Sequence, residues 1–548
     1  MIITDLLERN AKESGFEVAL VELNPSVRPR REDWKEFGLI EGGTDPRFRR
    51  EMTWAEFDLK ANRVANYLIS SGVRKGDKVA VLLMNCLEWL PVYFGILKTG
   101  ALAVPMNYRY TAEEIRYCLD LSDSSVLIFG EEFIGRVGEI LHALDGIRLL
   151  YASSALHREV PEFAGDFLEL VEYSACDRPA VTSTLTEEDD AAIYFSSGTT
   201  GFPKAILHTH RALINSAVTE QAHHGQQHDD VFICIPPLYH TGAKMHWFGS
   251  LYSCSKAVLL RGVTPGWIIR AAAIEHASIV WLLVPWAQDI LDAVDRGDID
   301  LAEYDLSRWR LMHIGAQPVP PSLIRRWKNV FPNHEYDTNY GLSESTGPGC
   351  VHLGVENVDH VGAIGKAGYG WKTRICDENG NDVKRGEVGE LWVSGPGVMK
   401  CYYKNPAATA EVLRDGWLLT GDMAMEDSEG FIYLVDRKKD VIISGGENLY
   451  PVQIEDFIRA HAAVKDVAVI GLPDKRLGEI AAAIIEVKPG FAVTEEEIET
   501  FCMGLPRYKR PRKIIFAEVP RNPTGKIEKP KLREKYCGER LVEAQIRS

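Results

Sequence analysis

The stretches TWAEFDLKANRVANYLISS at residues 53–71 and KVAVLL at residues 78–83 contain the pattern that decides the fold. The first repeats apolar residues at helical spacing, and the second is a continuous apolar run with the length of a buried strand. Further apolar runs follow, separated by helical patterns: ALAVPM at 101–106, SSVLIF at 124–129, VFICIP at 231–236, KAVLL at 256–260 and SIVWLL at 278–283. Apolar strands that alternate with helices are typical of parallel sheets covered on both faces. The sequence therefore predicts an α/β protein.

The pattern changes near residue 360, where short strands and turn residues replace the helix–strand alternation. Stretches such as DENGNDVKRGEVGELWVSG predict antiparallel hairpins. A smaller unit of helices and apolar runs begins after DRKKD at 436–440. We expect a large N-terminal domain over residues 1–438, β-rich from about 360, and a small mobile α+β C-terminal domain over 439–548, with a hinge near Lys439.

Composition limits the partners and the compartment. The formal net charge of −16 argues against general nucleic-acid binding, which usually needs a basic surface. The ten cysteines contain no CxxC pair, which favours reduced thiols over a disulfide framework or a zinc site. The N-terminus lacks the apolar segment of a signal peptide, and the most apolar stretch, IVWLLVPWA at 279–287, is too short to span a bilayer. We expect a soluble, cytoplasmic protein without a membrane span. The sequence leaves open whether it forms a homo-oligomer.

The segment YFSSGTTGFPKA at 194–205 combines glycines, hydroxyls and a lysine after an apolar strand. A Walker A loop places its lysine directly after the last glycine, whereas Phe202 and Pro203 intervene here. Glycines let backbone amides turn toward an anion, and hydroxyls add donors. We interpret the segment as a phosphate-binding loop, with a surface turn as the alternative. Its candidate ligands are Ser196, Ser197, Gly198, Thr199, Thr200, Gly201 and Lys204.

Two further motifs suit a nucleotide. In NYGLSES at 339–345, a tyrosine ring can lie on a base and Glu344 can hold a magnesium ion; a strand end with a surface glutamate is the alternative. In GWLLTGD at 416–422, Asp422 can accept hydrogen bonds from ribose hydroxyls. The alternative interpretation is an ordinary Asx turn at Asp422.

The last two motifs lie near the C-terminus. DRKKDVIISGGENLYP at 436–451 contains a charged cluster, a strand and a glycine pair. The alternative interpretation of this stretch is a solvated linker followed by a hairpin. In NPTGKIEKPKL at 522–532, Gly525 lets Lys526 project from a turn, although a lone surface lysine usually serves only solubility. The order and spacing of all five motifs carry more information than any one of them.

Together the motifs resemble the AMP-forming acyl-CoA synthetases of the adenylating superfamily, which includes firefly luciferase and the adenylation domains of peptide synthetases. The resemblance runs from TWAEF near residue 53 to TGKI near residue 527. Ser343 stands where threonine is commoner, and residues 24–50 are longer than expected and receive no role. Besides the loop, the resemblance implies these nucleotide-site residues: Gly315, Ala316, Asp337, Tyr340, Gly341, Ser343, Glu344, Asp422, Arg437 and Lys526.

The resemblance implies two steps. A carboxylate attacks ATP to give an acyl-adenylate and pyrophosphate, and coenzyme A then takes the acyl group and releases AMP. The implied catalytic residues are Lys526, Thr200, Glu344 and His240, with Glu344 and Thr200 at the Mg²⁺ ion. A swing about Lys439 would withdraw Lys526 and bring in a coenzyme A segment made of Gly445, Gly446 and Glu447.

The implied acyl pocket follows PLYH in the stretch PPLYHTGAKMHWFGSLY at 236–252. Its candidates are His240, Lys244, Met245, Trp247, Gly315 and Gly341. The alternatives are a structural histidine, a solvated lysine, and core packing for the methionine and the tryptophan. We expect a compact cyclic, aromatic or short-to-medium-chain acid. The sequence leaves several alternatives open. The protein could be a medium- or long-chain fatty acid ligase, an enzyme that loads a carrier protein, a luciferase-like oxygenase or a non-catalytic relative, and the ligase reaction could run in reverse.

Overall fold

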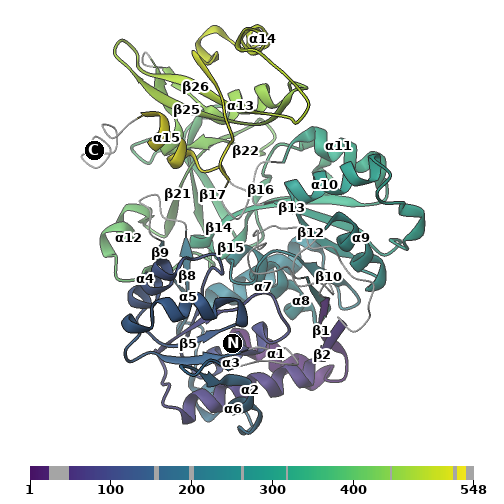
Figure 1. The fold of residues 1–548 in the computed structure, drawn as a ribbon, viewed down its shortest axis with the longest axis vertical. Coiled ribbons are helices and arrows are strands. Elements are labelled where there is room, and N and C mark those ends of the chain that lie inside the picture. The colour runs from purple at the N-terminus through teal and green to yellow at the C-terminus, as the bar shows by residue number, and fades with distance from the viewer. Residues whose placement is uncertain are drawn as a thin grey trace. The chain divides into compact units, whose positions relative to one another are not determined.

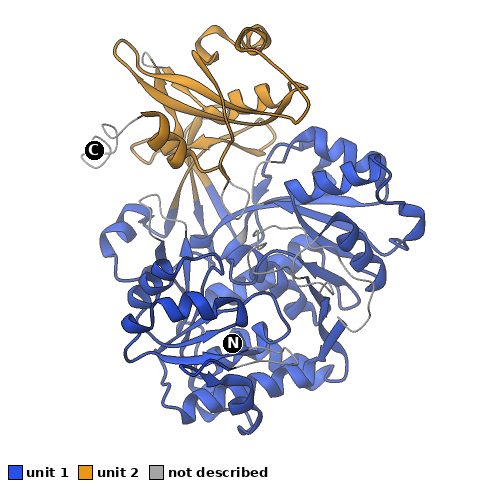
Figure 2. Cartoon of the chain, in the orientation of Figure 1, with its two compact units in different colours: residues 1–373, 393–418 blue, residues 374–392, 419–548 orange. Residues whose placement is uncertain are grey.

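The computed structural model describes residues 1–23, 49–152, 160–196, 203–260, 264–315, 319–444, 447–521 and 527–537. The chain forms two compact units (Figure 2). Unit 1 comprises residues 1–373 and 393–418, and unit 2 comprises residues 374–392 and 419–548. The predicted hinge near Lys439 concerns motion and stays a prediction.

An eight-stranded sheet in unit 1 has the order β19-β9-β8-β4-β3-β5-β6-β7. Three of its strands, β5, β8 and β9, are labelled in Figure 1. Strands β3 to β8 pair in parallel, whereas β9 pairs antiparallel with β8 and with β19. The strands are β3 (Lys78–Leu82), β4 (Leu102–Pro105), β5 (Ser124–Phe129), β6 (Arg148–Tyr151), β7 (Gly165–Asp166), β8 (Asp190–Ser196), β9 (Lys204–Thr209) and β19 (Cys401–Tyr402).

A nine-stranded sheet in unit 1 has the order β16-β15-β14-β13-β12-β10-β11-β1-β2. Its central strands are parallel, and antiparallel strands lie at both ends. The strands are β1 (Val18–Leu23), β2 (Arg49–Thr53), β10 (Val231–Cys234), β11 (Lys256–Leu260), β12 (Ile279–Leu283), β13 (Leu311–Gly315), β14 (Glu335–Leu342), β15 (Gly347–Leu353) and β16 (Lys366–Ala367).

Helices separate these strands as the sequence predicts, which confirms the α/β class. The predicted helix over 53–71 is α2 (Trp54–Ser70), and it starts at a capping box in which Thr53 and Glu56 satisfy each other's backbone amides. The other helices of unit 1 are α1 (Ile3–Glu13), α3 (Trp89–Lys98), α4 (Ala112–Ser122), α5 (Ile134–Glu139), α6 (Phe167–Glu172), α7 (His210–His224), α8 (Thr241–Ser253), α9 (Pro265–Ile274), α10 (Val284–Asp295), α11 (Pro321–Val330) and α12 (Pro406–Val412).

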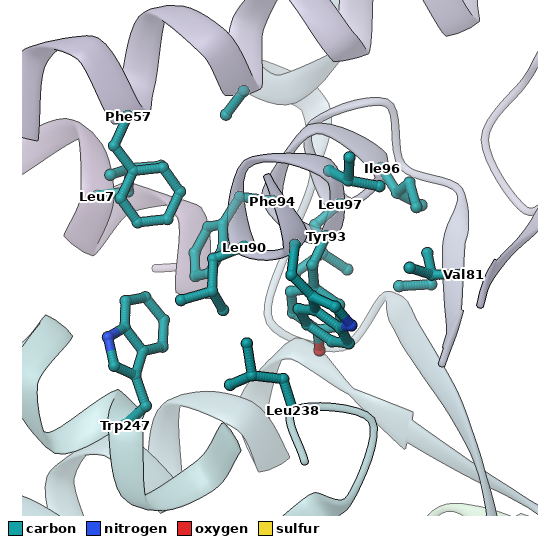
Figure 3. Close-up of a cluster of buried hydrophobic side chains, with 14 of the residues drawn as sticks. Leu7, Phe57, Val81, Leu90, Tyr93, Phe94, Ile96, Leu97, Leu238 and Trp247 are labelled. Atoms are coloured by element: carbon teal, nitrogen blue, oxygen red, sulfur yellow. The ribbon is translucent and has the colours of Figure 1, made fainter. Parts of the chain in front are cut away.

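Aromatic side chains join α2, α3 and α8 in the largest core cluster of unit 1 (Figure 3). Phe94 packs edge-on against Phe57 and Trp247, with ring centroids 5.5 and 5.8 Å apart. These rings are fully buried, and such pairs add about 0.5–1.5 kcal/mol each beyond the burial of their area. Helix α8 is therefore held rigidly from one side.

Unit 2 contains hairpins and a smaller sheet covered by helices; the sequence predicts both kinds of element but assigns the hairpins to the N-terminal domain. Strands β17 (Lys372–Cys376), β18 (Val388–Ser394) and β21 (Trp417–Glu426) are adjacent in one sheet, and β22 (Ile432–Arg437) pairs antiparallel with β21. In unit 1, the short β20 (Leu413–Arg414) pairs with the start of β21. The second sheet contains β23 (Ile442–Ser444), β24 (Glu447–Leu449), β25 (Val464–Asp474), β26 (Gly478–Val487) and β27 (Lys513–Phe516), accompanied by α13 (Pro451–Arg459), α14 (Glu495–Phe501) and α15 (Lys529–Cys537).

Candidate active site

The predicted phosphate loop connects two paired strands. Strands β8 and β9 are antiparallel and remain in register up to the pair of Ser196 and Lys204. The loop itself lies outside the described residues, and with it the predicted ligands Ser197, Gly198, Thr199, Thr200 and Gly201. The two ends of the loop therefore lie opposite each other at the end of a fixed hairpin.

Glu344 lies close to this hairpin because β19 pairs with β9. The Tyr402 hydroxyl donates a 2.8 Å hydrogen bond to Oε1 of Glu344, and the backbone amide of Met399 donates to the Glu344 carbonyl at 2.7 Å. Burial and the adjacent carboxylate raise the pKa of Tyr402, so its hydroxyl stays protonated as a donor. The Lys204 ammonium lies 4.8 Å from the centroid of the same tyrosine ring. A carboxylate and an ammonium of the predicted nucleotide site thus border one ring.

Ser343 is anchored by two neighbouring elements. His208 on β9 donates from Nε2 to the Ser343 carbonyl at 2.8 Å, since a carbonyl can only accept. The hydroxyls of Ser343 and Thr241, the first residue of α8, lie 3.2 Å apart. Burial lowers the pKa of His208 to about 4, so the ring is neutral at pH 7. These contacts fix the turn that carries Glu344.

The predicted adenine-side residues lie at the ends of β13 and β14. Gly315 ends β13, where an added Cβ would make only an ordinary van der Waals contact of 3.7 Å with the carbonyl oxygen of Asn339. Tyr340 is buried and Gly341 half-buried, both on β14. Ala316 lies outside the described residues.

The predicted acyl-pocket residues lie on different faces of α8. His240 caps the helix, because its Nδ1 accepts from the amide of Gly242 at 3.1 Å. Trp247 and Met245 are fully buried, with Trp247 packed in the aromatic core and the Ser216 hydroxyl 3.1 Å from the Met245 sulfur. These contacts agree with the core-packing alternative, and the pocket assignment of both stays a prediction.

Lys244 is fully buried, so the alternative of a solvated lysine is wrong. Its Nζ lies 4.0 Å from the ring centroid of Tyr194, 4.5 Å from that of Tyr93 and 5.3 Å from that of Trp89. It has no hydrogen-bond partner within the described part of the chain. Burial lowers the pKa of Lys244 well below its ordinary value.

In unit 2, Asp422 and Arg437 face each other. They are register partners on β21 and β22, and Arg437 Nε lies 3.2 Å from Asp422 Oδ1. Asp422 lies within a strand, so the Asx-turn alternative is wrong. Burial lowers the pKa of Lys439, which follows on a 3₁₀ turn, and Glu447 is exposed on β24. Gly445, Gly446 and Lys526 lie outside the described residues, although Arg521 and Ile527 pair on either side of the lysine segment.

Asp337, predicted in the nucleotide set, is fully buried among histidines. Its Oδ1 accepts from Nδ1 of His313 at 2.7 Å and its Oδ2 from Nε2 of His352 at 3.1 Å. His224 and His246 lie next to His313, with ring centroids 4.7 and 4.6 Å away. Both oxygens of this carboxylate are therefore directed at imidazoles.

Sequence reasoning missed Tyr402, His208 and this group of histidines. Tyr402 lies in CYYKN, which contains no recognisable nucleotide motif, and it reaches Glu344 only because β19 pairs with β9. The histidines could have been noticed as single polar residues in apolar strands, in LMHIG and GCVHL.

Two family sequence profiles match the chain. The AMP-binding enzyme profile matches residues 40–403, and that of the AMP-binding enzyme C-terminal domain matches residues 453–526. The chain belongs to the AMP-binding enzyme family. It is an AMP-forming acid–thiol ligase, with acyl-CoA ligases among its relatives.

Three similar proteins show how widely the ligase resembles known members. It is 35% identical over 508 residues to the long-chain-fatty-acid–CoA ligase FadD13 of Mycobacterium tuberculosis, with 91% of this chain and 95% of the relative covered. It is 33% identical over 489 residues to a feruloyl-CoA synthase of Amycolatopsis sp, with 88% and 94% covered. The structure of the anthranilate CoA ligase AuaEII in complex with anthranoyl-AMP superposes with a TM-score of 0.84 at 26% identity, covering 99% of this chain and 98% of that one.

Across the described ranges, none of the helices combines the length and the apolar character needed to cross a membrane.

Proposed function

We propose that the ligase activates a compact cyclic, aromatic or short-to-medium-chain carboxylic acid with ATP and transfers the acyl group to coenzyme A. The observation that carries the proposal is the carboxylate of Glu344, oriented by Tyr402, whose ring is also contacted by Lys204 at the end of the predicted phosphate loop. Neither step needs a protein nucleophile, because the carboxylate and the thiol attack in turn. The protein contributes position and charge.

The residues around Glu344 fit a magnesium ion. Mg²⁺ prefers oxygen ligands and is commonly held by one or two carboxylates together with substrate phosphates. Glu344 offers a carboxylate, and the hydroxyl of Thr200 belongs to the adjacent loop. When bound, the ion would neutralise phosphate charge. Lys204 and the loop amides would follow the pyrophosphate as it leaves.

In unit 2, the proposed roles follow from charge. Asp422 would accept hydrogen bonds from the ribose hydroxyls, and its pairing with Arg437 keeps its carboxylate oriented. Lys526 would bridge the acid and the α-phosphate as a point charge, which suits an ammonium on a flexible stem. Lys439 would act as the hinge, and Gly445, Gly446 and Glu447 would border coenzyme A in the second step.

The wall between α8 and β12 supports a compact acid. The His246 ring stacks on Trp281 with centroids 4.2 Å apart, and a Cβ added at Gly242 would lie 3.3 Å from the Trp281 ring. We infer that these rings would narrow an acyl pocket beside α8. The similarity to a feruloyl-CoA synthase and to an anthranilate ligase favours a compact acid, whereas the similarity to a long-chain ligase favours the alternative.

The test is a panel of linear short-, medium- and long-chain, branched, alicyclic, aromatic and dicarboxylic acids, with AMP and thioester measured with and without coenzyme A. We expect the highest kcat/KM with a compact acid. A preference for long chains would contradict the acid class, and an acyl-adenylate that coenzyme A does not consume would contradict the thioester step. Glu344→Gln should lower adenylation by about 100-fold, whereas Glu303→Gln, at an exposed position, should not.

A further inference from the structure

Three buried histidines from three elements converge beneath the ends of β13 and β14. We call His224 on α7, His246 on α8 and His313 on β13, together with Glu220 on α7, the histidine cluster. One nitrogen of each histidine can be chosen so that all three lie within 4.8 Å of one another, and every member of the cluster is at most 3% exposed. The cluster lies wholly within unit 1.

The hydrogen bonds of two rings leave two lone pairs facing each other. Nδ1 of His246 meets the Gly242 carbonyl, and Nδ1 of His313 meets the Asp337 carboxylate at 2.7 Å. Both partners only accept, so both Nδ1 atoms carry the proton in the neutral rings. The two Nε2 atoms are then both acceptors, yet they lie 2.9 Å apart, while the side-chain amide of Asn339 lies 3.4 Å from Nε2 of His246. A cation between them would remove this repulsion.

The other two members carry buried polar atoms that no described residue satisfies. Neither ring nitrogen of His224 nor Oε2 of Glu220 has a hydrogen-bond partner within the described ranges. Nδ1 of His224 lies 3.5 Å from Oε2 of Glu220, and Nε2 of His246 lies 3.7 Å from the same oxygen. Buried polar groups are nearly always satisfied, so several unsatisfied atoms in one place indicate a missing common partner.

We propose that His224, His246, His313 and Glu220 bind a zinc ion. Zn²⁺ takes imidazole nitrogens and carboxylate oxygens in a tetrahedral site, whereas Mg²⁺ and Ca²⁺ prefer oxygen alone. The contacts around the cluster match those of zinc ligands, whose second ring nitrogen donates to a carbonyl or carboxylate. Gly242 and Asp337 serve His246 and His313 in this way, and Asn339 holds the other oxygen of Glu220 at 3.1 Å.

A single proton explains less of the geometry. A proton shared between His246 and His313 would satisfy those two nitrogens but would leave both ring nitrogens of His224 and Oε2 of Glu220 without hydrogen-bond partners among the described residues. Zinc would give all four groups a partner. In a tetrahedral site with Zn–N near 2.0 Å the ligand nitrogens lie about 3.3 Å apart, so the His246–His313 pair would open slightly and the more distant ligand atoms, within 4.8 Å here, would move closer. Four protein ligands make the site a structural one that ties α7 and α8 to β13.

The test measures metal in the full-length protein, produced without a histidine tag and without chelators. We expect about one zinc per chain by mass spectrometry, as for a closed four-ligand site. His224→Gln should reduce this to below a tenth while circular dichroism stays native, because His224 makes no hydrogen bond that folding would lose. His334→Gln is the matched control, since His334 is also a buried ring but stacks on Trp309 outside the cluster. It should retain the metal.

Cobalt gives a second measurement that is independent of activity. Chelator-treated protein should take up Co²⁺ with the intense visible absorption of tetrahedral coordination, and Glu220→Gln should weaken that uptake in a folded protein. The proposal is overturned if folded protein supplied with zinc or cobalt binds neither. Equal metal content in the wild type and His224→Gln, or equal loss in His334→Gln, also overturns it.

Discussion

Lys244 and Lys98 are both fully buried, yet their surroundings differ completely. Lys98 bonds to Asp58 at 2.6 Å, Asn62 at 2.7 Å and Glu8 at 3.0 Å. Lys244 faces the rings of Trp89, Tyr93 and Tyr194 and has no hydrogen-bond partner among the described residues. We predict that Lys244→Met stabilises the protein and that Lys98→Met destabilises it.

The magnitudes follow from the contacts. A cation facing one aromatic ring gains about 0.5–2 kcal/mol, whereas burying an ion costs several kcal/mol. Burial lowers the pKa of Lys244 well below its ordinary value, which favours the neutral amine. An unsatisfied buried donor then costs about 1–3 kcal/mol, which methionine of similar length removes. Lys98→Met should instead cost about 1.5–3 kcal/mol, because it removes hydrogen bonds between a buried ammonium and the half-buried carboxylates of Asp58 and Glu8.

The effect at Lys244 must also depend on pH. Its pKa is lowered in the fold from 10.5, so the unfolded chain binds a proton that the folded chain does not. This lowers stability below pH 10.5 and restores it as the pH rises. The advantage of Lys244→Met should therefore shrink by about 1.4 kcal/mol per pH unit as the pH approaches 10.5 from below.

Urea unfolding followed by tryptophan fluorescence at pH 8 and 9.5 measures this change. The difference between Lys244→Met and the wild type should narrow by about 2 kcal/mol between those two pH values. A destabilised methionine variant, or a difference independent of pH, would refute the assignment of a neutral, unpartnered amine.

Three further predictions concern the site. Tyr402→Phe removes a charge-assisted hydrogen bond worth about 1.5–3 kcal/mol, so ATP–pyrophosphate exchange should need more Mg²⁺ or fall by 10-fold or more, and an unchanged Mg²⁺ dependence would count against the role of Glu344. Lys526→Ala should lose adenylation by about 100-fold but largely spare thioester formation from supplied acyl-adenylate, and equal damage to both half-reactions would contradict the hinge mechanism. Burial lowers the pKa of His208 from 6.5 to about 4, so the unfolded chain binds a proton more readily than the folded one and the free energy of unfolding should fall by about 3 kcal/mol as the pH drops from 6.5 to 4. His208→Gln should remove this loss, as urea unfolding at pH 7 and 4.5 can show.

Much of the fold follows from local pattern. The capping box of Thr53 and Glu56 and the apolar runs at 78–83 and 278–283 place helices and strands where the structure has them. The sequence does not predict that residues 374–392 belong to unit 2, because the hairpins on both sides of this segment have the same alternation of polar and apolar residues. Only the long-range pairing of strands shows which hairpin belongs to which unit.

Part of the candidate site can be predicted from the sequence and part of it cannot. Glu344 and Asp422 lie in motifs that are recognisable in the sequence. The hydrogen-bond partner of Glu344 cannot be predicted, because Tyr402 reaches it through the pairing of two residues of β19 with β9, which no local pattern specifies. The burial of Lys244 depends on rings contributed by α3 and β8, so helical spacing alone left its surroundings open.

The discontinuity of unit 1 has a practical consequence for anyone who shortens this chain. The segment 393–418 returns to unit 1 between two excursions into unit 2, and it brings β19 with it. A chain cut at residue 373 would keep Glu344 and Lys204 but lose the hydroxyl that orients the carboxylate. Cutting at residue 418 keeps the hydroxyl but leaves residues 374–392 without β21, the strand beside β18. An isolated unit 1 therefore requires internal excision and rejoining rather than truncation.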